Sequence, residues 1–242
     1  MAALHHEHLP GHDPHVERYG HDWRATERVQ EYVGRADREL DLRREGLNVL
    51  VALVPFPSTE PIRVLDVGTG QGLLASLLLD AYPHATAVGL DVSEPMSEVA
   101  AERMAAYGDR FTFVLGDFVD AELPATPGGA FDVAVSSRAI HHLPGAHKQR
   151  LYATIHRGLR PGGAFFNLDG VAPPDERLRP RYREARERLS RHPRGEGHHL
   201  KGHYFEMLDQ HLALLRGAGF DPVDCFWKRL DLVLLGGYKL SS

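Results

Sequence analysis

The feature that most constrains this chain is a regular alternation of strand-like and helix-like segments between residues 62 and 169. Five short apolar runs are separated by helical patterns of about ten residues or more; the runs are IRVLDVG, ATAVGLD, FTFVLGD, FDVAVSS and AFFNLD. Apolar strands joined through helices form a parallel sheet that is buried on both faces, with right-handed crossovers. The pattern therefore predicts an α/β fold that binds its ligands at the carboxyl ends of the strands.

The end of the chain completes this sheet in a different way. The runs VDCFWKR and LVLLGGYK are joined only by Leu230 and Asp231, a connection short enough for an antiparallel hairpin. We predict a seven-stranded sheet that is mostly parallel, ends in an antiparallel C-terminal hairpin and has helices on both faces. A chain of 242 residues can bury one such core without division into several domains.

The domain organisation follows from these patterns. Residues 1–22 are rich in His, Pro, Gly and Asp without apolar periodicity, which predicts a flexible arm. We assign 23–242 to a single domain. Its parts are an N-terminal helical lid (23–58), a ligand-binding core (62–169), a helical insertion (173–202) and a closing helix with the hairpin (203–242).

The net charge and the cysteine content restrict the classes of partner and the cellular location that we expect. The formal net charge of −5 gives no overall electrostatic reason to bind DNA or RNA. Cys225 is the single cysteine and cannot form an intramolecular disulfide, and the first residues lack a secretion signal. No run approaches the roughly 18 apolar residues of a membrane span. We expect a cytoplasmic protein with a small-molecule partner, no nucleic acid and no membrane; a homodimer is compatible with the sequence.

A glycine-rich loop follows the first strand. In VLDVGTGQG, Gly68, Gly70 and Gly72 carry no side chains, so the backbone can approach a ligand closely. The G-x-G-x-G spacing differs from the G-x-G-x-x-G of dinucleotide sites. A phosphate-binding P-loop is also a poor match, since no Gly-Lys-Ser/Thr follows and Asp66 would repel phosphate. The loop suits an uncharged or cationic ligand.

Five motifs together carry a family resemblance. DVGTGQG, GLDVSEPM, GDF, FDVAVSSRAIHHL and LRPGGAFFNLD occur in this order over residues 62–169, and the chain resembles the class I S-adenosylmethionine-dependent methyltransferases. The closing VDCFWKRLDLVLLGGYK is similar to the terminal hairpin of that family. The resemblance implies a Rossmann-like domain that transfers a methyl group from S-adenosylmethionine to a small molecule, with the accepting atom (O, N or C) left open.

The resemblance also implies a set of cofactor-binding residues. They are Asp66, Gly68, Thr69, Gly70, Gly72, Asp91, Val92, Met96, Asp117, Phe118 and Ser136. Asp66 would meet the ammonium of the methionine part, and Asp91 would accept hydrogen bonds from the ribose hydroxyls. Val92 and Met96 would flank the adenine, with Asp117 and Phe118 at its amino group and edge. Met96 and Phe118 could instead be core residues, and Ser136 and Ser137 a strand cap.

Candidate catalytic residues follow the fourth and fifth strands. By the resemblance, Arg138, His141 and His142 face the transferable methyl group and the acceptor. Methyl transfer depends mainly on positioning, and a base is needed only for a hydroxyl, a carbon acid or a protonated amine. The candidate bases are His141, His142 and Asp169. The alternative is that the histidines of AIHHL only cap or pack.

Two clusters outside the core bear on the acceptor and on metals. Residues 175–196 contain eight arginines and five acidic residues, which gives a net charge of +3. Most of this charge fits a solvated helix face with internal i,i+4 pairs. An anionic acceptor could nevertheless bind one or two of the arginines. The histidines gather in two groups, one at 198, 199 and 203 and one at 5, 6, 8, 12 and 15. Neither has the spacing of a known zinc site, so we predict no metal; His198 and His203 could instead border the acceptor pocket.

Other functions remain open at this point. An RNA or protein methyltransferase is one alternative, although the chain has SSRAIHH where an adenine-methylating enzyme would carry a motif such as N/D-P-P-Y/F. A non-catalytic protein that only binds S-adenosylmethionine is another. A carboxylated variant of the cofactor is a third, because Arg138 and the arginine-rich insertion could hold its extra charge.

Overall fold

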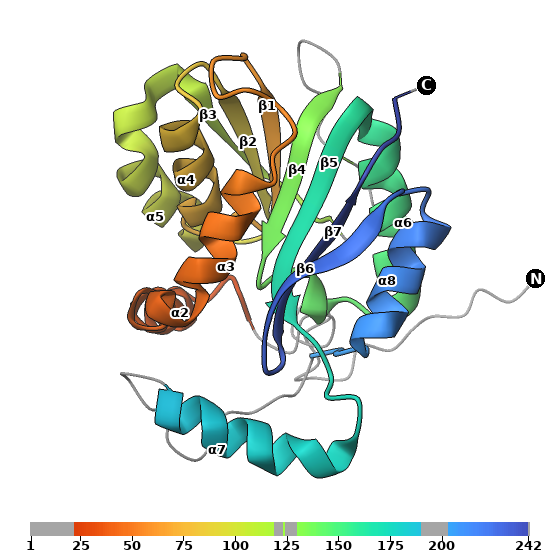
Figure 1. Cartoon of the computed structure of the whole chain (residues 1–242). Helices are drawn as coiled ribbons and strands as arrows, with labels where there is room; N and C mark the ends of the chain where they lie inside the picture. Colours follow the sequence, from red (N-terminus) through yellow and green to blue (C-terminus); the bar gives the residue numbers. More distant parts are fainter. Residues whose placement is uncertain (1–21, 119–122, 124–129, 190–202, 242) are drawn as a thin grey trace, which may run out of the picture.

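The computed structural model describes residues 22–118, 123, 130–189 and 203–241 (Figure 1). The predicted arm, and the part of the insertion that holds His198, His199, Arg191 and Arg194, lie outside these residues.

Within the described residues, seven strands form one sheet in the order β3-β2-β1-β4-β5-β7-β6. The strands are β1 (Arg63–Val67), β2 (Thr86–Asp91), β3 (Phe111–Leu115), β4 (Phe131–Ser137), β5 (Leu159–Gly170), β6 (Val223–Arg229) and β7 (Leu232–Tyr238). Neighbours from β3 to β5 pair in parallel, whereas β7 runs antiparallel to both β5 and β6. The predicted Rossmann-like sheet with a C-terminal hairpin is confirmed. The strand order reverses between β1 and β4, and such a reversal opens a ligand crevice.

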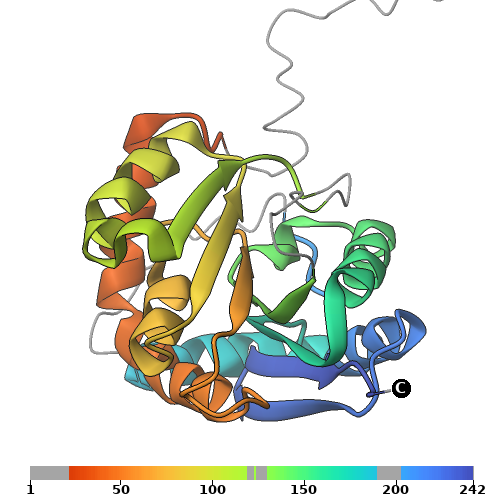
Figure 2. The same cartoon turned by 90° about the horizontal axis from the view of Figure 1, so that it is seen from above.

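Helices cover both faces of the sheet (Figure 2). The helices of the described residues are α2 (Thr26–Arg38), α3 (Leu40–Ala52), α4 (Leu73–Ala81), α5 (Glu94–Met104), α6 (Gly145–Gly158), α7 (Arg179–Leu189) and α8 (Leu208–Gly217), with short 3₁₀ turns η1 (Ala105–Arg110), η2 (Ile140–His142) and η3 (Glu176–Leu178). Alternate residues of β1 enter two separate cores. Leu65 and Val67 pack with α6 and α8, whereas Val64 packs with α3 and α4.

Local sequence signals set the ends of several elements. The Ser93 side chain accepts a hydrogen bond from the Met96 backbone N–H at 3.2 Å and caps α5. Gly219, with φ of +103°, follows the last turn of α8 in the left-handed conformation that glycine favours. Leu230 adopts φ of +59° in the two-residue turn between β6 and β7. These signals account for the start of α5, the end of α8 and the turn of the hairpin.

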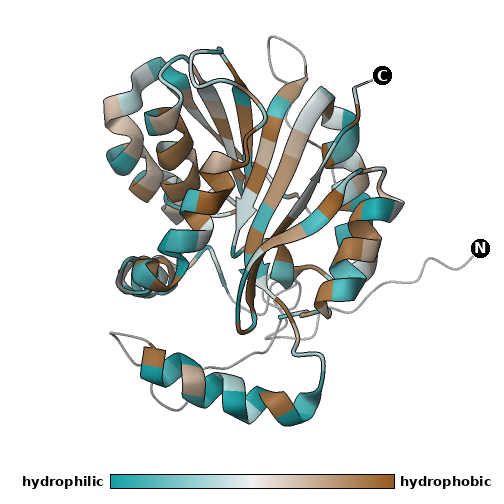
Figure 3. Cartoon of the chain, viewed as in Figure 1, coloured by the Kyte–Doolittle hydropathy of each residue, from teal (hydrophilic) through white to brown (hydrophobic). Residues whose placement is uncertain are grey.

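The N-terminal helices and α7 differ in how they are packed. Helix α3 lies on α4 and reaches the β5-β7-β6 side of the sheet, where Gly46 sits against the Trp227 ring. Helix α7 has no buried residue and lies apart from the layers, at the bottom of Figure 1. Its surface is largely hydrophilic (Figure 3). No helix among the described residues is both long and apolar enough to cross a membrane.

Candidate functional site

The glycine loop after β1 takes a backbone shape that only glycine adopts readily. Gly68, Gly70 and Gly72 all have positive φ angles, of +67°, +53° and +82°. The backbone N–H groups of Gly68 and Thr69 donate to the Leu90 carbonyl at 2.8 and 3.1 Å. The loop is thereby held against the end of β2, so the ends of the two strands form one surface.

The three glycines have different surroundings. A Cβ atom on Gly68 would lie 2.2 Å from the Cβ of Ala139, and one on Gly72 would lie 2.7 Å from the Met104 side chain. A Cβ on Gly70 would meet nothing closer than the Met96 sulfur at 3.9 Å. Gly68 and Gly72 therefore permit close packing within the protein, while Gly70 leaves open space beside Met96 for a ligand.

Asp66 is a buried carboxylate with neutral partners. It accepts hydrogen bonds from the Thr69 hydroxyl at 2.8 Å and from the Ala75 backbone N–H at 3.2 Å. Burial raises its pKa to about 7, although these two hydrogen bonds act to lower it. A cationic group arriving at this carboxylate would stabilise its ionised form.

Asp91 joins the end of β2 to the glycine loop. One carboxylate oxygen accepts from the Gly70 N–H at 2.8 Å and the other from the Ser93 N–H at 3.0 Å. Burial raises the pKa of this carboxyl against the lowering effect of its backbone hydrogen bonds. Because each carboxylate oxygen has a second lone pair, Asp91 can still accept hydrogen bonds from a pair of hydroxyls.

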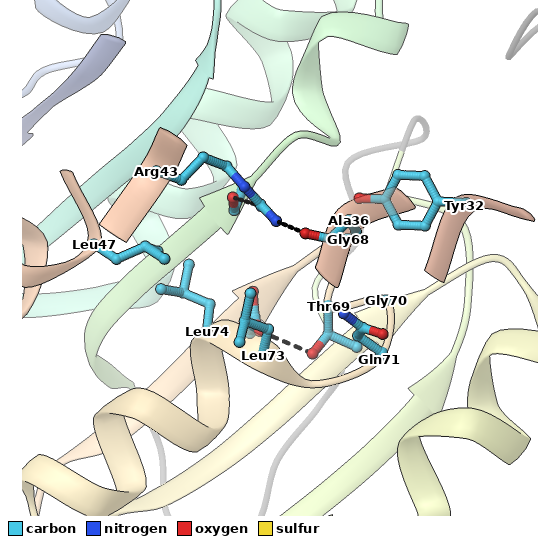
Figure 4. Close-up of a pocket in the computed structure, with 12 residues that line it drawn as sticks. Tyr32, Ala36, Arg43, Leu47, Gly68, Thr69, Gly70, Gln71, Leu73 and Leu74 are labelled. Atoms are coloured by element: carbon cyan, nitrogen blue, oxygen red, sulfur yellow. Dashed lines mark hydrogen bonds between the residues drawn. The ribbon is translucent and has the colours of Figure 1, made fainter. Parts of the chain in front are cut away.

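A small cavity lies between the glycine loop and the two N-terminal helices (Figure 4). Tyr32 and Ala36 of α2 line it, together with Arg43 of α3. The Arg43 guanidinium donates to the Ala36 carbonyl at 3.0 Å and reaches the Ser137 hydroxyl at 3.5 Å. The cavity measures about 30 Å³, far below the roughly 300 Å³ or more of a ligand pocket. In this structure α2 and α3 close over the loop.

Sequence reasoning did not identify these lid contacts. The Gln71 side-chain amide donates a hydrogen bond to the Asp37 carboxylate of α2 at 3.1 Å. The Arg103 guanidinium donates to the same carboxylate at 2.7 Å. The Ser93 hydroxyl donates to the Trp23 carbonyl at 2.5 Å. Gln71 lies in the glycine motif itself, but the sequence holds no signal for its partner 34 positions earlier.

The other predicted cofactor residues have varied surroundings. Met96 is buried with its sulfur toward Gly70, and Val92 is half-buried against the core. Phe118 is buried in the same core, and Asp117 is half-buried. The Ser136 hydroxyl is fully buried and donates to the Val67 carbonyl at 2.7 Å, so its side chain links β4 to β1. The structure thus brings the loop, Asp91 and Met96 together, and it places the Ser136 side chain against β1.

Two of the three candidate bases form a pair. The Nδ1 of His141 lies 2.6 Å from one Asp169 oxygen, and the His141 backbone N–H donates to the other oxygen at 3.0 Å. Burial alone would raise the pKa of Asp169, but the charge and hydrogen bonds of His141 and the Gly170 N–H lower it to about 2. Asp169 therefore holds the imidazole by Nδ1 and leaves Nε2 for other contacts.

His142, the third candidate, lies beside this pair. The ring centroids of His141 and His142 are 4.2 Å apart, and His203 packs against both at 4.7 and 4.8 Å. Trp23 meets His142 edge-on at 5.7 Å. The predicted association of His203 with the acceptor side thus has a structural counterpart, reached from a segment more than 60 positions away.

Arg138 carries backbone strain and a matched charge. Its φ is +57°, an unfavourable value for a residue with a side chain. Its guanidinium pairs with the buried Glu39 at 2.9 Å, at the junction of α2 and α3. Since Glu39 already balances this charge, Arg138 gives no support to a carboxylated cofactor; it ties the N-terminal helices to the end of β4.

Three of the six described arginines of the insertion form ion pairs: Arg177 with Asp175, Arg179 with Glu176 at 2.7 Å and Arg186 with Asp231 on the hairpin. The first two pairs are local and lie on an exposed surface, at spacings of two and three residues, and the third joins the insertion to the hairpin.

Known methyltransferases resemble this chain in sequence. A family model described as "Methyltransferase domain" matches residues 64–163. An uncharacterized methyltransferase of a Geobacillus strain is 32% identical over 157 residues, which cover 65% of this chain and 68% of that protein. The malonyl-[acyl-carrier protein] O-methyltransferase of Geobacter sulfurreducens is 32% identical over 186 residues, which cover 76% of this chain but only 65% of the relative's length.

A solved structure shows the same fold. Human N-acetylserotonin methyltransferase in complex with S-adenosylmethionine superposes with a TM-score of 0.64 at 18% identity, covering 95% of this chain and 61% of that one. The likeness extends beyond the motif region to the N-terminal helices and the terminal hairpin.

Proposed function

The chain belongs to the class I S-adenosylmethionine-dependent methyltransferases, and we propose that it transfers the methyl group to a small-molecule acceptor that loses a proton in the reaction. The observation that carries this proposal is the His141–Asp169 pair, with 2.6 Å between Nδ1 and Oδ1. The pair lies at the carboxyl ends of β4 and β5, the two strands that follow β1 in the order of the sheet. A methyltransferase whose acceptor carries no proton would need no such pair.

The glycine loop and two carboxylates would hold the cofactor. Asp66, whose present partners are neutral, suits the ammonium of the methionine part. Asp91 suits the ribose hydroxyls, and the space at Gly70 beside Met96 suits the adenosine. The sulfonium is a cation, which agrees with a loop that has no phosphate-binding character. Together they orient the methyl group toward the end of β4.

The reaction itself is an in-line displacement. The acceptor atom forms a bond to the methyl carbon as the carbon–sulfur bond breaks, and the sulfur keeps the electron pair as a neutral thioether. Nε2 of His141 takes the acceptor's proton, and Asp169 stabilises the imidazolium through Nδ1. Positioning supplies most of the acceleration, and the base adds about 10²–10⁴-fold.

The acceptor class follows from this chemistry. Hydroxyls, carbon acids and protonated amines all lose a proton on methylation, and the O-methyltransferase relative makes oxygen the first to test. The ion pairs of Arg177 in η3 and of Arg179 at the start of α7 support a small molecule over a polyanion such as RNA. A cytoplasmic location is part of the proposal, and the single cysteine, which excludes an intramolecular disulfide, is consistent with it.

Closure of the N-terminal helices has a consequence for binding. The cavity between the glycine loop and the two helices is small, about 30 Å³, and we expect α2 to shift when S-adenosylmethionine binds. The contacts that shift would break or rearrange are those of Asp37 with Gln71 and Arg103 and that of Arg43 with Ala36. The same helices would then cover the bound cofactor and exclude water.

The experiment that tests the proposal measures the cofactor first and the acceptor second. Calorimetric titration of S-adenosylmethionine into the wild-type protein should give binding in the micromolar range, about −8 kcal/mol, and Asp91→Ala should weaken it tenfold or more. Asp109→Ala, which removes an exposed carboxyl, is the matched control. A panel of hydroxyl, carboxylate and amine compounds is then screened for release of S-adenosylhomocysteine.

The outcomes separate the remaining alternatives. Absence of heat and of a thermal shift with both S-adenosylmethionine and its demethylated product would overturn the cofactor assignment. Binding without turnover on small molecules, RNA or protein would indicate a non-catalytic binder. Turnover on RNA or protein alone would replace the small-molecule acceptor.

A further inference from the structure

Three histidines converge beside the proposed methyl-transfer centre. His141 and His142 lie in η2, after β4, and His203 lies just before α8. One ring nitrogen from each lies within 4.8 Å of the others. We infer that His141, His142 and His203 together bind a divalent transition-metal ion of the zinc type. The binding needs only these residues, whereas the role of the ion rests on the proposed function.

The ligand set suits such an ion. Zinc takes imidazole nitrogens at about 2.0–2.1 Å, and catalytic zinc sites use three protein ligands with a fourth position open. Nitrogens at that distance lie about 3.4 Å from one another in a tetrahedral site. Small rotations of the three side chains would therefore close the present spacing of up to 4.8 Å. Calcium and magnesium, which prefer oxygen ligands, would not compete well.

Asp169 holds the His141 ring in an orientation that suits metal binding. Asp169 holds Nδ1 at 2.6 Å, so Nε2 is the nitrogen of His141 that would bind the ion. A carboxylate behind a metal-bound histidine sets the tautomer and raises the affinity of the site for its ion. The buried negative charge of Asp169 also compensates for a nearby dication.

The segment that carries His203 is held in place by contacts on both sides. The Tyr204 backbone N–H donates to the His141 carbonyl at 2.7 Å, and the Ala172 N–H donates to the Glu206 carbonyl at 2.9 Å. The buried Lys148 ammonium bonds both the Tyr204 carbonyl and the Glu206 carboxylate. His203 therefore approaches His141 through a built framework.

An ion at this place would act on the acceptor. Ala139 packs on Gly68, and Trp23 contacts both His142 and the Ser93 hydroxyl after Asp91, so the cluster adjoins the cofactor site. An acceptor oxygen in the open metal position would be anchored and acidified by the Lewis acid. His141 would then serve as a ligand and not as the base: the ion would lower the pKa of the acceptor hydroxyl, and its proton would pass to solvent before methyl transfer.

The test measures metal directly and removes the competing histidines of the arm. The parent protein is the full chain with the histidines of the arm, His5, His6, His8, His12, His15 and His21, changed to Ala. Metal-free parent is titrated with Zn²⁺ by calorimetry and with Co²⁺ by visible absorption. We expect one ion per chain at micromolar or tighter affinity, and a Co²⁺ spectrum of four-coordinate type.

Matched variants assign the ligands. His203→Ala in this parent should weaken Zn²⁺ binding tenfold or more and abolish the Co²⁺ spectrum, and Asp169→Asn should weaken it about 10–100-fold. His84→Ala, which removes an exposed histidine, should leave binding unchanged. Thermal unfolding checks that each variant folds, and His203→Asn replaces the alanine variant if that one does not.

Two results would overturn the site: no stoichiometric ion in the parent, or equal binding by the parent and His203→Ala. Either would identify the three rings as an aromatic cluster, with His141 as an unassisted base. Titration of S-adenosylmethionine into metal-free parent keeps the two proposals apart. Cofactor binding without metal uptake removes the ion alone, and metal uptake without cofactor binding removes the proposed function alone.

Discussion

The cofactor side and the acceptor side of the site both centre on a buried carboxylate at the end of a strand, yet the two carboxylates behave in opposite ways. Asp66 has only a hydroxyl and a backbone N–H as partners, and burial raises its pKa to about 7. Asp169 is equally buried, but His141 and three hydrogen bonds bring its pKa to about 2. Burial raises a carboxyl pKa, and a neighbouring basic group decides whether that rise persists.

This difference indicates which carboxylate already has a basic partner within the protein. Asp66 accepts hydrogen bonds from the Thr69 hydroxyl and the Ala75 N–H, which are both neutral, and the proposed function would give it a cationic partner, the ammonium of the cofactor. Asp169 already has His141 and serves to orient it. The cofactor side is thus completed by its ligand, whereas the acceptor side is assembled by the protein.

The largest expected effect comes from Asp169→Asn, which acts on the acceptor side alone. The amide cannot hold His141 in the required tautomer, so we expect the methyl-transfer rate to fall about 10²–10⁴-fold while S-adenosylmethionine affinity changes less than about threefold. Single-turnover kinetics and calorimetry measure the two quantities, with His84→Ala as the control. A parallel loss of rate and cofactor affinity would contradict the separation of the two sides.

The next effect distinguishes two glycines of the cofactor side. Gly68→Ala places a Cβ at 2.2 Å from Ala139 in a left-handed conformation, which combines strain with overpacking and should cost about 2–5 kcal/mol. Gly70→Ala has the same strain but open space, and should cost only about 1–2 kcal/mol. We expect a clearly lower Tm for the first by calorimetry. Equal Tm values would mean that the Ala139 contact relaxes without cost.

A pH series tests the Asp66 carboxylate. The unfolded pKa is 3.8 and the folded value about 7, so the cofactor-free protein should lose stability as pH rises between these values, because the unfolded chain releases the proton first. Cofactor binding favours the ionised carboxylate. Below pH 7, the affinity for the cofactor should therefore increase by up to about tenfold for each unit by which the pH rises. Asp66→Asn should flatten both profiles, measured by thermal unfolding and calorimetry. A wild-type profile that matches the Asn variant would place the pKa of Asp66 near its ordinary value.

The smallest expected effect is at η3, the short turn before α7, which belongs to neither side. Arg177→Ala removes an exposed ion pair with Asp175, and exposed pairs contribute little. We expect the rate to change less than about twofold and the Tm by about one degree or less. A larger loss of rate with an anionic acceptor would assign Arg177 to the recognition of that acceptor.

The sequence by itself determined the cofactor side. Glycines at 68, 70 and 72 permit positive φ angles at fixed positions, and the alternation of strands and helices brings Asp66 and Asp91 to neighbouring strand ends. These are properties of local backbone and of the period of apolar residues, and both can be read from a single chain. The hairpin at residues 230 and 231 was equally predictable, because two residues leave little choice of connection.

Only the tertiary structure decided the acceptor side and the lid. His141 and His142 were candidates from their place after a strand, but their pairing with Asp169 and with His203 depends on contacts across 28 or more positions. The histidine group expected at 198–203 contributes its last member to a different cluster. The sequence predicts that Arg138 faces the methyl group and the acceptor, whereas in the structure its guanidinium forms an ion pair with Glu39. Side-chain partners of this kind are set by packing between distant segments, and a single sequence carries no periodic signal for them.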